Sequence, residues 1–268
     1  MNQVDGAWWL TFFDDAYADL HLATDTAESR ARRDATADFI VDALALQPGD
    51  RVLDQCCGVG RMACALARRG LSVVGVDFID GYIERARAAA RSEGVAGRCT
   101  FQVGDAHEFV PDEACDAVIN WYTSFGYSAD DDANARMLRA GHDSLKPGGR
   151  FLLDHTSLPF VLSNFRESIV QRRTLPNGEE VFVVQEPGLH FAPRMFRTRW
   201  TFVHPDGRKD VRWSEHRAYM PEELMGLLER AGFVSVGLFG AIDRSPFVRD
   251  SPRCILTARR PESGTSHG

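Results

Sequence analysis

Three acidic residues and two glycines are spaced so that they could hold one ligand that contains a nucleoside. Asp54 ends a short apolar run, and Gly58 and Gly60 follow it just before a segment with helical character. Glycines at a strand-to-helix turn let a ligand approach the backbone, and the helix N-terminus offers free N–H groups. Asp77 ends the next apolar run, where a carboxylate can accept hydrogen bonds from two ribose hydroxyls, and Asp105 follows the third. Each acid alone could be a helix cap or a turn residue, but their order indicates one binding edge.

The residues around this turn limit which ligand fits. Phe78 and Ile79 can cover the flat face of an adenine, and Asp105 could receive its amino group. A dinucleotide site uses three glycines at the turn to receive a pyrophosphate, and this turn has two. The carboxylate of Asp54 is a poor neighbour for a diphosphate and a good one for an ammonium group. The pattern therefore favours a cofactor that joins adenosine to an amino acid over NAD or NADP.

The elements that must position these residues alternate between strand and helix. The predicted strands are 51–55, 72–77, 100–103, 116–121 and 150–154, and the predicted helices between them are 61–69, 80–92 and 130–145. Short apolar strands separated by helices are typical of βαβ crossovers. We therefore expect an α/β fold with a doubly wound, mostly parallel sheet that is covered by helices on both faces.

The alternation of predicted strands and helices ends in the second half of the chain. Strands are predicted at 180–185, 196–203 and 212–219, with a turn at Pro205-Asp206-Gly207. They indicate an inserted antiparallel β cap. A helix at 221–231 and strands at 233–239 and 252–259 follow, and the two strands have no helix between them. Such strands form an antiparallel pair, so we expect a seven-stranded sheet with an antiparallel last strand.

The domain organisation follows from the same pattern. We expect a single domain over residues 1–260, with no linker long enough to divide it. Predicted helices at 7–20 and 28–46 make residues 1–46 an N-terminal helical lid, and residues 157–220 make up the cap and substrate region. Residues 261–268 are expected to be a disordered tail.

Five segments resemble the successive motifs of class I S-adenosylmethionine-dependent methyltransferases of the small-molecule type. They are Val52-Leu53-Asp54-Gln55-Cys56-Cys57-Gly58-Val59-Gly60-Arg61, Val74-Gly75-Val76-Asp77, Gly104-Asp105-Ala106, Asp116-Ala117-Val118-Ile119-Asn120 and Leu145-Lys146-Pro147-Gly148-Gly149-Arg150. The likeness covers about residues 35–154, and the final helix and strand pair also fit this Rossmann-like fold. Cys56 stands where the family usually has the first glycine of the turn, which its side chain tolerates if the backbone φ is negative.

The resemblance implies S-adenosylmethionine as methyl donor and S-adenosylhomocysteine as product. It places Asp54 and Gly58 by the methionine part, Asp77 by the ribose, and Asn120 at the methyl-donor site. The expected cofactor-binding residues are Asp54, Cys57, Gly58, Gly60, Arg61, Asp77, Phe78, Ile79, Asp105, Ala106, Asn120 and Trp121. The expected activity is methyl transfer to a nitrogen or oxygen of a small molecule, as in antibiotic biosynthesis.

Methyl transfer from a sulfonium needs an acceptor in line with the S–CH₃ bond and exclusion of water. Aromatic residues of the lid, of the 121–127 loop and of the cap could provide this enclosure, although many such rings could be plain core. The resemblance places Tyr17 and the 121–127 loop near the methyl group. The expected substrate residues are Tyr17, Tyr122, Phe125, Tyr127, Trp200 and Arg217. Arg217 and its neighbour His216 could bind an acidic substrate or simply face solvent.

Tyr17 and His155 are the expected catalytic residues. His155 follows the fifth predicted strand and could be the general base for a hydroxyl acceptor. A histidine that only caps the end of the strand fits this position as well. An amine acceptor needs no base if it arrives neutral, and His155 would then orient it.

Composition limits the other partners. The net charge of −7, with 44% apolar and 26% charged residues, is typical of a globular protein that does not wrap nucleic acid. Asn120-Trp121-Tyr122-Thr123 also lacks the Asn-Pro-Pro-Tyr pattern of nucleic-acid base and protein amide methyltransferases. Six cysteines without C-x-x-C spacing argue against a metal site and for reduced thiols in the cytoplasm.

Three further expectations stay open at this stage. No apolar window has the length of a membrane span, so we expect no membrane partner. The aromatic N-terminal helix could pair two copies in a homo-oligomer instead of closing a lid. The alternatives for function are an NAD(P)-dependent oxidoreductase and a non-catalytic S-adenosylmethionine-binding protein.

Overall fold

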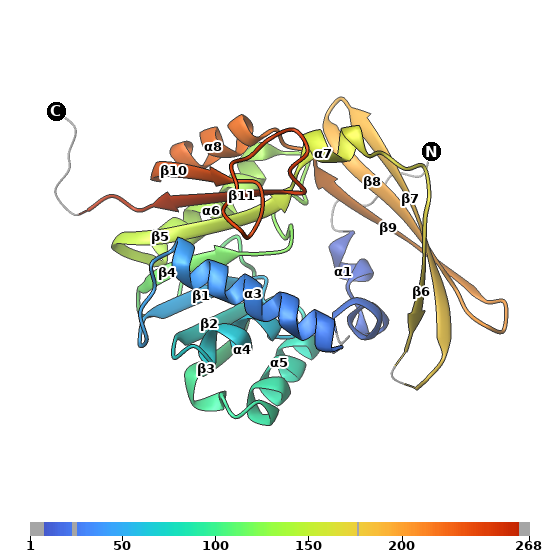
Figure 1. The fold of residues 1–268 in the computed structure, drawn as a ribbon, viewed down its shortest axis with the longest axis horizontal. Coiled ribbons are helices and arrows are strands. Elements are labelled where there is room, and N and C mark those ends of the chain that lie inside the picture. The colour runs from blue at the N-terminus through green and yellow to red at the C-terminus, as the bar shows by residue number, and fades with distance from the viewer. Residues whose placement is uncertain (1–7, 23–25, 176, 263–268) are drawn as a thin grey trace.

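The computed structural model describes residues 8–22, 26–175 and 177–262, and its core is a mixed seven-stranded sheet (Figure 1). The strands lie in the order β10-β11-β5-β4-β1-β2-β3. Their bounds are β1 Arg51–Gln55, β2 Ser72–Asp77, β3 Cys99–Val103, β4 Cys115–Asn120, β5 Leu145–Thr156, β10 Val234–Phe239 and β11 Arg253–Arg259. Neighbours pair in parallel except that β11 runs antiparallel to both β5 and β10. The predicted fold class is thus confirmed.

Helices cover both faces of this sheet, because its strands are apolar on both sides. The helices are α3 Ala27–Ala43, α4 Arg61–Ala67, α5 Asp80–Ser92, α6 Asp131–Asp143 and α8 Pro221–Arg230. Side chains of α3, α4 and α5 share one buried cluster with Val52, Val73 and Ile119. Side chains of α6 and α8 share the other with Leu53 and Val118. Alternate residues of β1 and β4 therefore point into opposite cores, as a strand covered on both faces requires.

A second, four-stranded antiparallel sheet packs beside the first and is the predicted cap (Figure 1). Its strands are β6 Ile169–Thr174, β7 Glu180–Phe191, β8 Arg194–Val203 and β9 Lys209–Arg217, in that order, and a short helix, α7 Leu158–Ser163, leads into it. Three of these strands were predicted from the sequence, whereas β6 and α7 were not. The sequence of β6 is Ile-Val-Gln-Arg-Arg-Thr, whose polar second half hides the strand pattern.

The N-terminal segment is less regular than predicted. In place of one helix at 7–20, the chain forms α1 Trp9–Phe12, α2 Asp15–Tyr17 and a π-helical turn Ala18–Leu22. Elsewhere in the chain, a 3₁₀ turn Ala96–Arg98 precedes β3. The break occurs because Phe13 is extended and the Asp14 side chain accepts a hydrogen bond from the Tyr17 N–H, which caps a new helix. Residues 1–7 of the predicted lid and 263–268 of the predicted tail lie outside the described residues. None of the described helices is long and apolar enough to cross a bilayer.

Candidate active site

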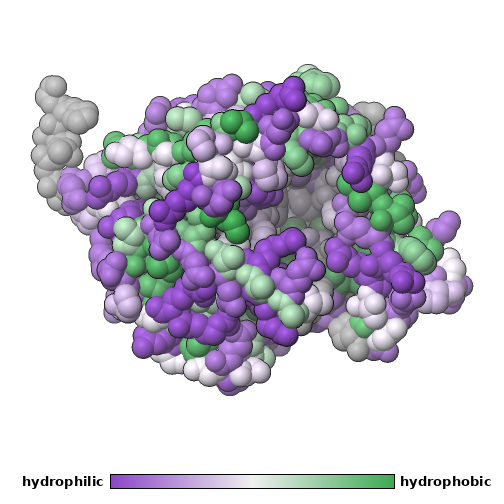
Figure 2. All heavy atoms as spheres, viewed as in Figure 1, coloured by the Kyte–Doolittle hydropathy of each residue, from purple (hydrophilic) through white to green (hydrophobic). Residues whose placement is uncertain are grey.

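A large cavity lies between the carboxyl edge of the seven-stranded sheet and the inner face of the four-stranded sheet. Its volume is about 970 Å³, at the upper end of the range for small-molecule sites. The space-filling view shows a recess between these two parts of the molecule (Figure 2). The β1–α4 turn and the ends of β2 and β4 form one wall, the N-terminal helices form a second, and β6 to β9 form a third. The cavity is therefore large enough for a cofactor and a second molecule.

The acidic wall of the cavity has an unpartnered carboxylate. Asp54 is only 2% exposed, and its Oδ2 has no hydrogen-bond partner among the described residues. Burial, reinforced by the nearby charge of Asp77, raises the pKa of Asp54 to about 8. An unpaired buried carboxylate is costly, and a bound ammonium group would relieve that cost. Asp54 thus fits the amino-acid end of the predicted cofactor.

Asp77, at the end of β2, holds the β1–α4 turn and the start of the segment after β2 by hydrogen bonds. Its Oδ2 accepts a hydrogen bond from the Gly58 N–H at 2.9 Å, and its Oδ1 accepts one from the Ile79 N–H at 3.1 Å. Burial still raises the pKa of Asp77. Gly58 has a φ of +55°, which favours glycine, and a Cβ there would have Leu22 as its nearest described neighbour, at 3.8 Å. The carboxylate predicted to bind the ribose therefore lies against Gly58, predicted to contact the methionine part, and Ile79, predicted to contact the adenine.

Two residues of the turn differ from their predicted roles. Cys56 has a φ of +56°, so the condition of a negative φ that the sequence analysis set for this position is not met. A non-glycine residue in this region stores backbone strain. Gly60 does not line the cavity: a Cβ there would lie 2.7 Å from the Cβ of Ala86 and 3.0 Å from the ring of Phe101. Gly60 is therefore a packing glycine, which lets α4 approach α5 and β3.

The loop after β4 is strained and lines the cavity. Tyr122 and Thr123 have φ values of +66° and +59°. Asp154 at the end of β5 holds both: its Oδ2 accepts the Tyr122 N–H at 3.0 Å, and its backbone carbonyl accepts the Thr123 N–H at 3.1 Å. Strain of this kind concentrates at functional sites, where the surroundings enforce it. The loop is thus fixed in one conformation beside the predicted methyl-donor position.

The N-terminal helices close the cavity with aromatic rings. The ring of Trp8 lies 4.9 Å from that of Tyr127, and the ring of Phe12 lies 5.1 Å from Tyr17 and 5.4 Å from Trp200 (centroid distances). The lid therefore contacts both the loop after β4 and the cap. An ion pair reinforces this closure, since Arg212 of β9 reaches the Asp14 carboxylate at 2.6 Å.

The structure brings most of the predicted site residues together. Those that line the cavity are Tyr17, Asp54, Cys57, Gly58, Arg61, Asp77, Phe78, Ile79, Trp121, Tyr122, Tyr127 and Trp200. Three predicted residues lie at the same sheet edge but do not line the cavity: Asp105 and Ala106, which follow β3, and Asn120, which ends β4. The Asp105 carboxylate accepts from the His107 N–H at 2.9 Å, and the Asn120 amide donates to the Met137 sulfur at 3.2 Å. Contact of these three with the cofactor stays a prediction.

Three predicted residues are corrected by their surroundings. Phe125 is fully buried, stacked on Tyr219 at 5.7 Å in the second core, so it cannot touch a substrate. Arg217 is held by both carboxylate oxygens of Asp131, at 3.0 and 2.9 Å, and is outside the cavity. It supports the cap.

His155 is the third correction. It is 1% exposed, does not line the cavity, and its Nδ1 donates to the Thr156 carbonyl at 3.1 Å. Burial, with the nearby His216 adding to it, lowers the pKa of His155 to about 3. The alternative that the sequence left open, a histidine that only completes the strand end, agrees with this geometry.

The sequence analysis missed the contribution of the cap's inner face. Alternate residues of β6 to β9 point into the cavity, and the polar ones are Arg173, Gln185, Thr198, Ser214 and His216. His216 was considered as a ligand for an acidic substrate, and the other four were not predicted to line a cavity. Their signal was the period-2 pattern of the inserted strands, in which polar residues occupy inward positions because the face lines a cavity.

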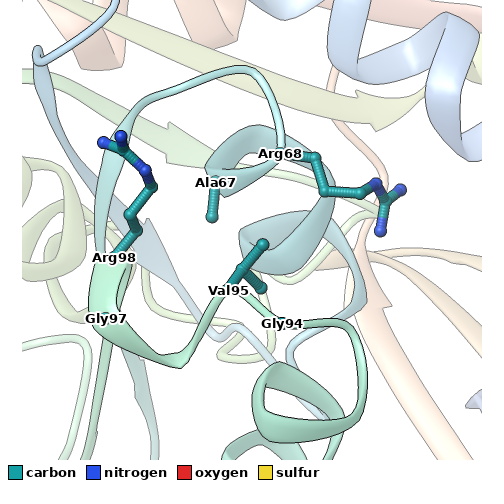
Figure 3. A pocket seen from close by; sticks show the side chains of 6 residues that line it. All are labelled: Ala67, Arg68, Gly94, Val95, Gly97 and Arg98. Atoms are coloured by element: carbon teal, nitrogen blue, oxygen red, sulfur yellow. The ribbon is translucent and has the colours of Figure 1, made fainter.

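A second hollow lies apart from this site, between the end of α4 and the turn before β3 (Figure 3). It is lined by Ala67, Arg68, Gly94, Val95, Gly97 and Arg98. Figure 3 shows the two arginine side chains pointing away from each other. Arg68 pairs with Asp34 and Glu93, and Arg98 donates to the Gly70 carbonyl at 3.0 Å. Because both guanidinium groups have protein partners, nothing in this hollow selects a ligand.

Potential metal ligands do not gather anywhere in the described ranges: no group of three or more histidine, cysteine or acidic residues is placed to hold an ion. The six cysteines are all free thiols.

Comparison with known proteins supports this assignment. Residues 52–149 match the family model described as "Methyltransferase domain". The 27-O-demethylrifamycin SV methyltransferase of Amycolatopsis mediterranei is 27% identical over 92% of this chain and 95% of its own length. An S-adenosyl-L-methionine-dependent Diels-Alderase of Talaromyces variabilis is 34% identical over 41% of this chain. The chain spans less than half the length of several curated relatives, 37% in the case of the Diels-Alderase.

Solved structures show the same fold over almost the whole chain. The sugar N-methyltransferase KedS8 from Streptoalloteichus superposes with a TM-score of 0.68 and 18% identity, over 89% of this chain and 94% of its own. Other methyltransferase structures reach a TM-score of 0.73 at 18–20% identity. The family model over residues 52–149 and the shared fold therefore bear out the resemblance to class I S-adenosylmethionine-dependent methyltransferases. S-adenosylmethionine, the predicted cofactor, is confirmed as the cofactor of this family.

Proposed function

We propose that the protein transfers a methyl group from S-adenosylmethionine to a nitrogen or oxygen of a small molecule of natural-product type. The observation that carries this proposal is the buried Oδ2 of Asp54, which has no hydrogen-bond partner among the described residues and lies in a cavity of about 970 Å³. The carboxylate supports a ligand with an ammonium group, and the size supports a second molecule beside it.

In this proposal the cofactor lies along the carboxyl edge of the parallel strands. Asp54 would bind its ammonium group, Asp77 its ribose hydroxyls, and Phe78 and Ile79 its adenine face. When bound, the cofactor supplies an electrophilic methyl group on a positively charged sulfur. The protein has to aim the acceptor at that methyl group and exclude water. The rings of Trp8, Phe12 and Trp200 close the cavity and so help to exclude water.

The type of acceptor is argued from the cap and the relatives. Arg173, Gln185, Thr198 and Ser214 give the acceptor half of the cavity a polar face opposite the aromatic lid, which suits an acceptor that has both apolar and hydroxylated parts. One similar protein carries out, by its name, O-methylation of a rifamycin, and another is named a sugar N-methyltransferase. These names support a natural product as acceptor and leave nitrogen and oxygen equal as acceptor atoms.

Two experiments test the proposal. Calorimetry should show binding of S-adenosylhomocysteine and no response to NAD or NADP, and the reverse result would favour the oxidoreductase alternative. Methyl transfer from labelled S-adenosylmethionine is then measured on panels of aminosugars, macrolide-type alcohols and small amines. A protein that binds S-adenosylhomocysteine but labels no acceptor would instead be a non-methylating S-adenosylmethionine-binding protein.

A further inference from the structure

The inner face of the cap brings one histidine into the cavity wall. His216 lies on β9 opposite Phe196 of β8, and its imidazole packs on that phenylalanine ring at 5.4 Å between centroids. Ser214, two residues away on the same face, and Thr198 also line the cavity. Among the described residues that line the cavity, His216 is the only histidine. Its imidazole is thus the histidine side chain available to an acceptor bound there.

The surroundings of His216 keep its imidazole uncharged. Its Nε2 is buried and has no hydrogen-bond partner among the described residues, and no described carboxylate forms an ion pair with it. Behind it, the ring of His155 lies 6.0 Å away. Burial, with the nearby charge of Arg253 adding to it, lowers the pKa of His216 to about 4. A neutral imidazole always has one nitrogen with a free lone pair.

Of the other titratable groups that line the cavity, the buried tyrosines keep their protons, and the carboxylates of Asp54, Asp77 and Glu28 lie on walls other than the cap. Burial raises the pKa of Tyr17 to about 12 and that of Tyr127 well above its usual value, so both stay protonated and act as donors. Asp54 and Asp77 lie on the cofactor wall, where Asp77 already accepts two backbone N–H groups. The lone pair of His216 therefore has no competitor on the cap side.

We propose that His216 accepts the hydrogen bond of the acceptor's N–H or O–H group and so aims the acceptor's lone pair at the methyl group. This inference rests on the proposed function. In the step, the new C–N or C–O bond forms as the S–C bond breaks, and the bond's electron pair remains on the sulfur, which becomes a neutral thioether. The proton that the acceptor loses moves to the imidazole of His216 and from there to solvent, because burial disfavours a lasting imidazolium.

The test compares His216→Phe with His216→Asn, which keeps an acceptor oxygen, and with His190→Phe as control. His190 is a histidine of β7 in the same sheet that does not line the cavity. We expect His216→Phe to lower kcat about 100-fold, within the usual range for loss of a proton acceptor, with unchanged affinity for S-adenosylhomocysteine. His216→Asn should recover about tenfold of this loss, and His190→Phe should behave as wild type.

The outcomes separate the two proposals. Wild-type kcat in His216→Phe overturns the role of His216 and leaves the proposed methyl transfer intact. An equal loss in all three variants, or a parallel loss of S-adenosylhomocysteine binding, shows a structural effect and also overturns it. If His216→Phe fails to fold, the kcat of His216→Asn and His216→Gln decides, and two variants with wild-type kcat contradict the inference. Absence of methyl transfer in the wild type overturns the proposed function itself.

Discussion

Arg253 binds both carboxylate oxygens of Asp154, with N–O distances of 2.7 and 2.6 Å, directly behind the strained loop after β4. The same guanidinium donates to the Thr123 hydroxyl at 2.8 Å. Asp154 in turn accepts the Tyr122 N–H. Two adjacent non-glycine residues at positive φ cost on the order of 1–3 kcal/mol each, and this ion pair is what holds them. The last strand of the sheet, β11, is therefore connected to the geometry of the cavity.

Replacing Asp154 with Asn should destabilise the protein and loosen the loop. Asp154 is fully buried while Arg253 is 31% exposed at its side chain, so we expect a loss of about 2–3 kcal/mol in the free energy of unfolding, measured by urea denaturation. Asp250→Asn is the matched control, because its pair with Arg249 is exposed and worth close to zero. Equal effects of the two substitutions would contradict the role of the Asp154–Arg253 pair.

Asp54 should make both stability and cofactor binding depend on pH. Its pKa is raised to about 8 in the folded protein without ligand, against about 3.9 in an unfolded chain. The folded state therefore binds more protons between these values, so the free energy of unfolding should fall as pH rises from about 4 to about 8. An ammonium group needs the carboxylate form, so binding near pH 7 should release a proton.

Calorimetry in buffers of different ionisation enthalpy measures this release on binding of S-adenosylhomocysteine. Asp54→Asn should abolish the proton release, flatten the pH dependence of stability and weaken binding about 10- to 100-fold, as expected for loss of a charge-assisted hydrogen bond. Asp112→Asn, on the surface, should change none of these. Proton release that persists in Asp54→Asn would show that another group titrates on binding.

The fold was largely predictable because its strands have simple patterns. Arg51–Gln55 and Ser72–Asp77 were predicted with the same ends that the structure has, since each has a short apolar centre between polar end residues. β6 was not predictable in this way. Gln171 and Arg173 on its less exposed face are polar, and Arg173 faces a cavity instead of a core, so this strand has no clear apolar pattern.

The site was predictable where it lies on the β1–α4 turn and not where distant segments meet. Asp54 and Asp77 act from neighbouring parallel strands, whose register follows from the alternation of strands and helices. His155 and His216 both end strands, and nothing local distinguishes them. Only the packing of the cap on β5 decides that His216 faces the cavity and that His155 lies behind it.

Gly60 and Gly58 should respond differently to alanine, although both have positive φ. A Cβ on Gly60 would meet Ala86 at 2.7 Å, so Gly60→Ala should cost about 2–4 kcal/mol through overpacking and backbone strain. A Cβ on Gly58 has its nearest described neighbour, Leu22, at 3.8 Å, so Gly58→Ala should cost about 1 kcal/mol of stability. The loss in binding free energy for S-adenosylhomocysteine in Gly58→Ala should exceed the loss in its free energy of unfolding. Thermal unfolding with and without ligand checks this, and equal unfolding temperatures for the two variants would contradict the distinction.

Tyr17 should act as a hydrogen-bond donor over the whole working pH range. Burial raises its pKa to about 12, so its hydroxyl stays protonated up to about pH 10 and the rate of methyl transfer should show no loss from its ionisation below that pH. Tyr17→Phe should lower kcat about 10-fold or more, because the lid side of the cavity then loses a positioned polar group.

Tyr219→Phe is the matched control, since its buried hydroxyl donates to Asp131 at 2.7 Å but lies outside the cavity. It should lower stability by about 1 kcal/mol and leave kcat unchanged, whereas an unchanged kcat in Tyr17→Phe would remove Tyr17 from the reaction.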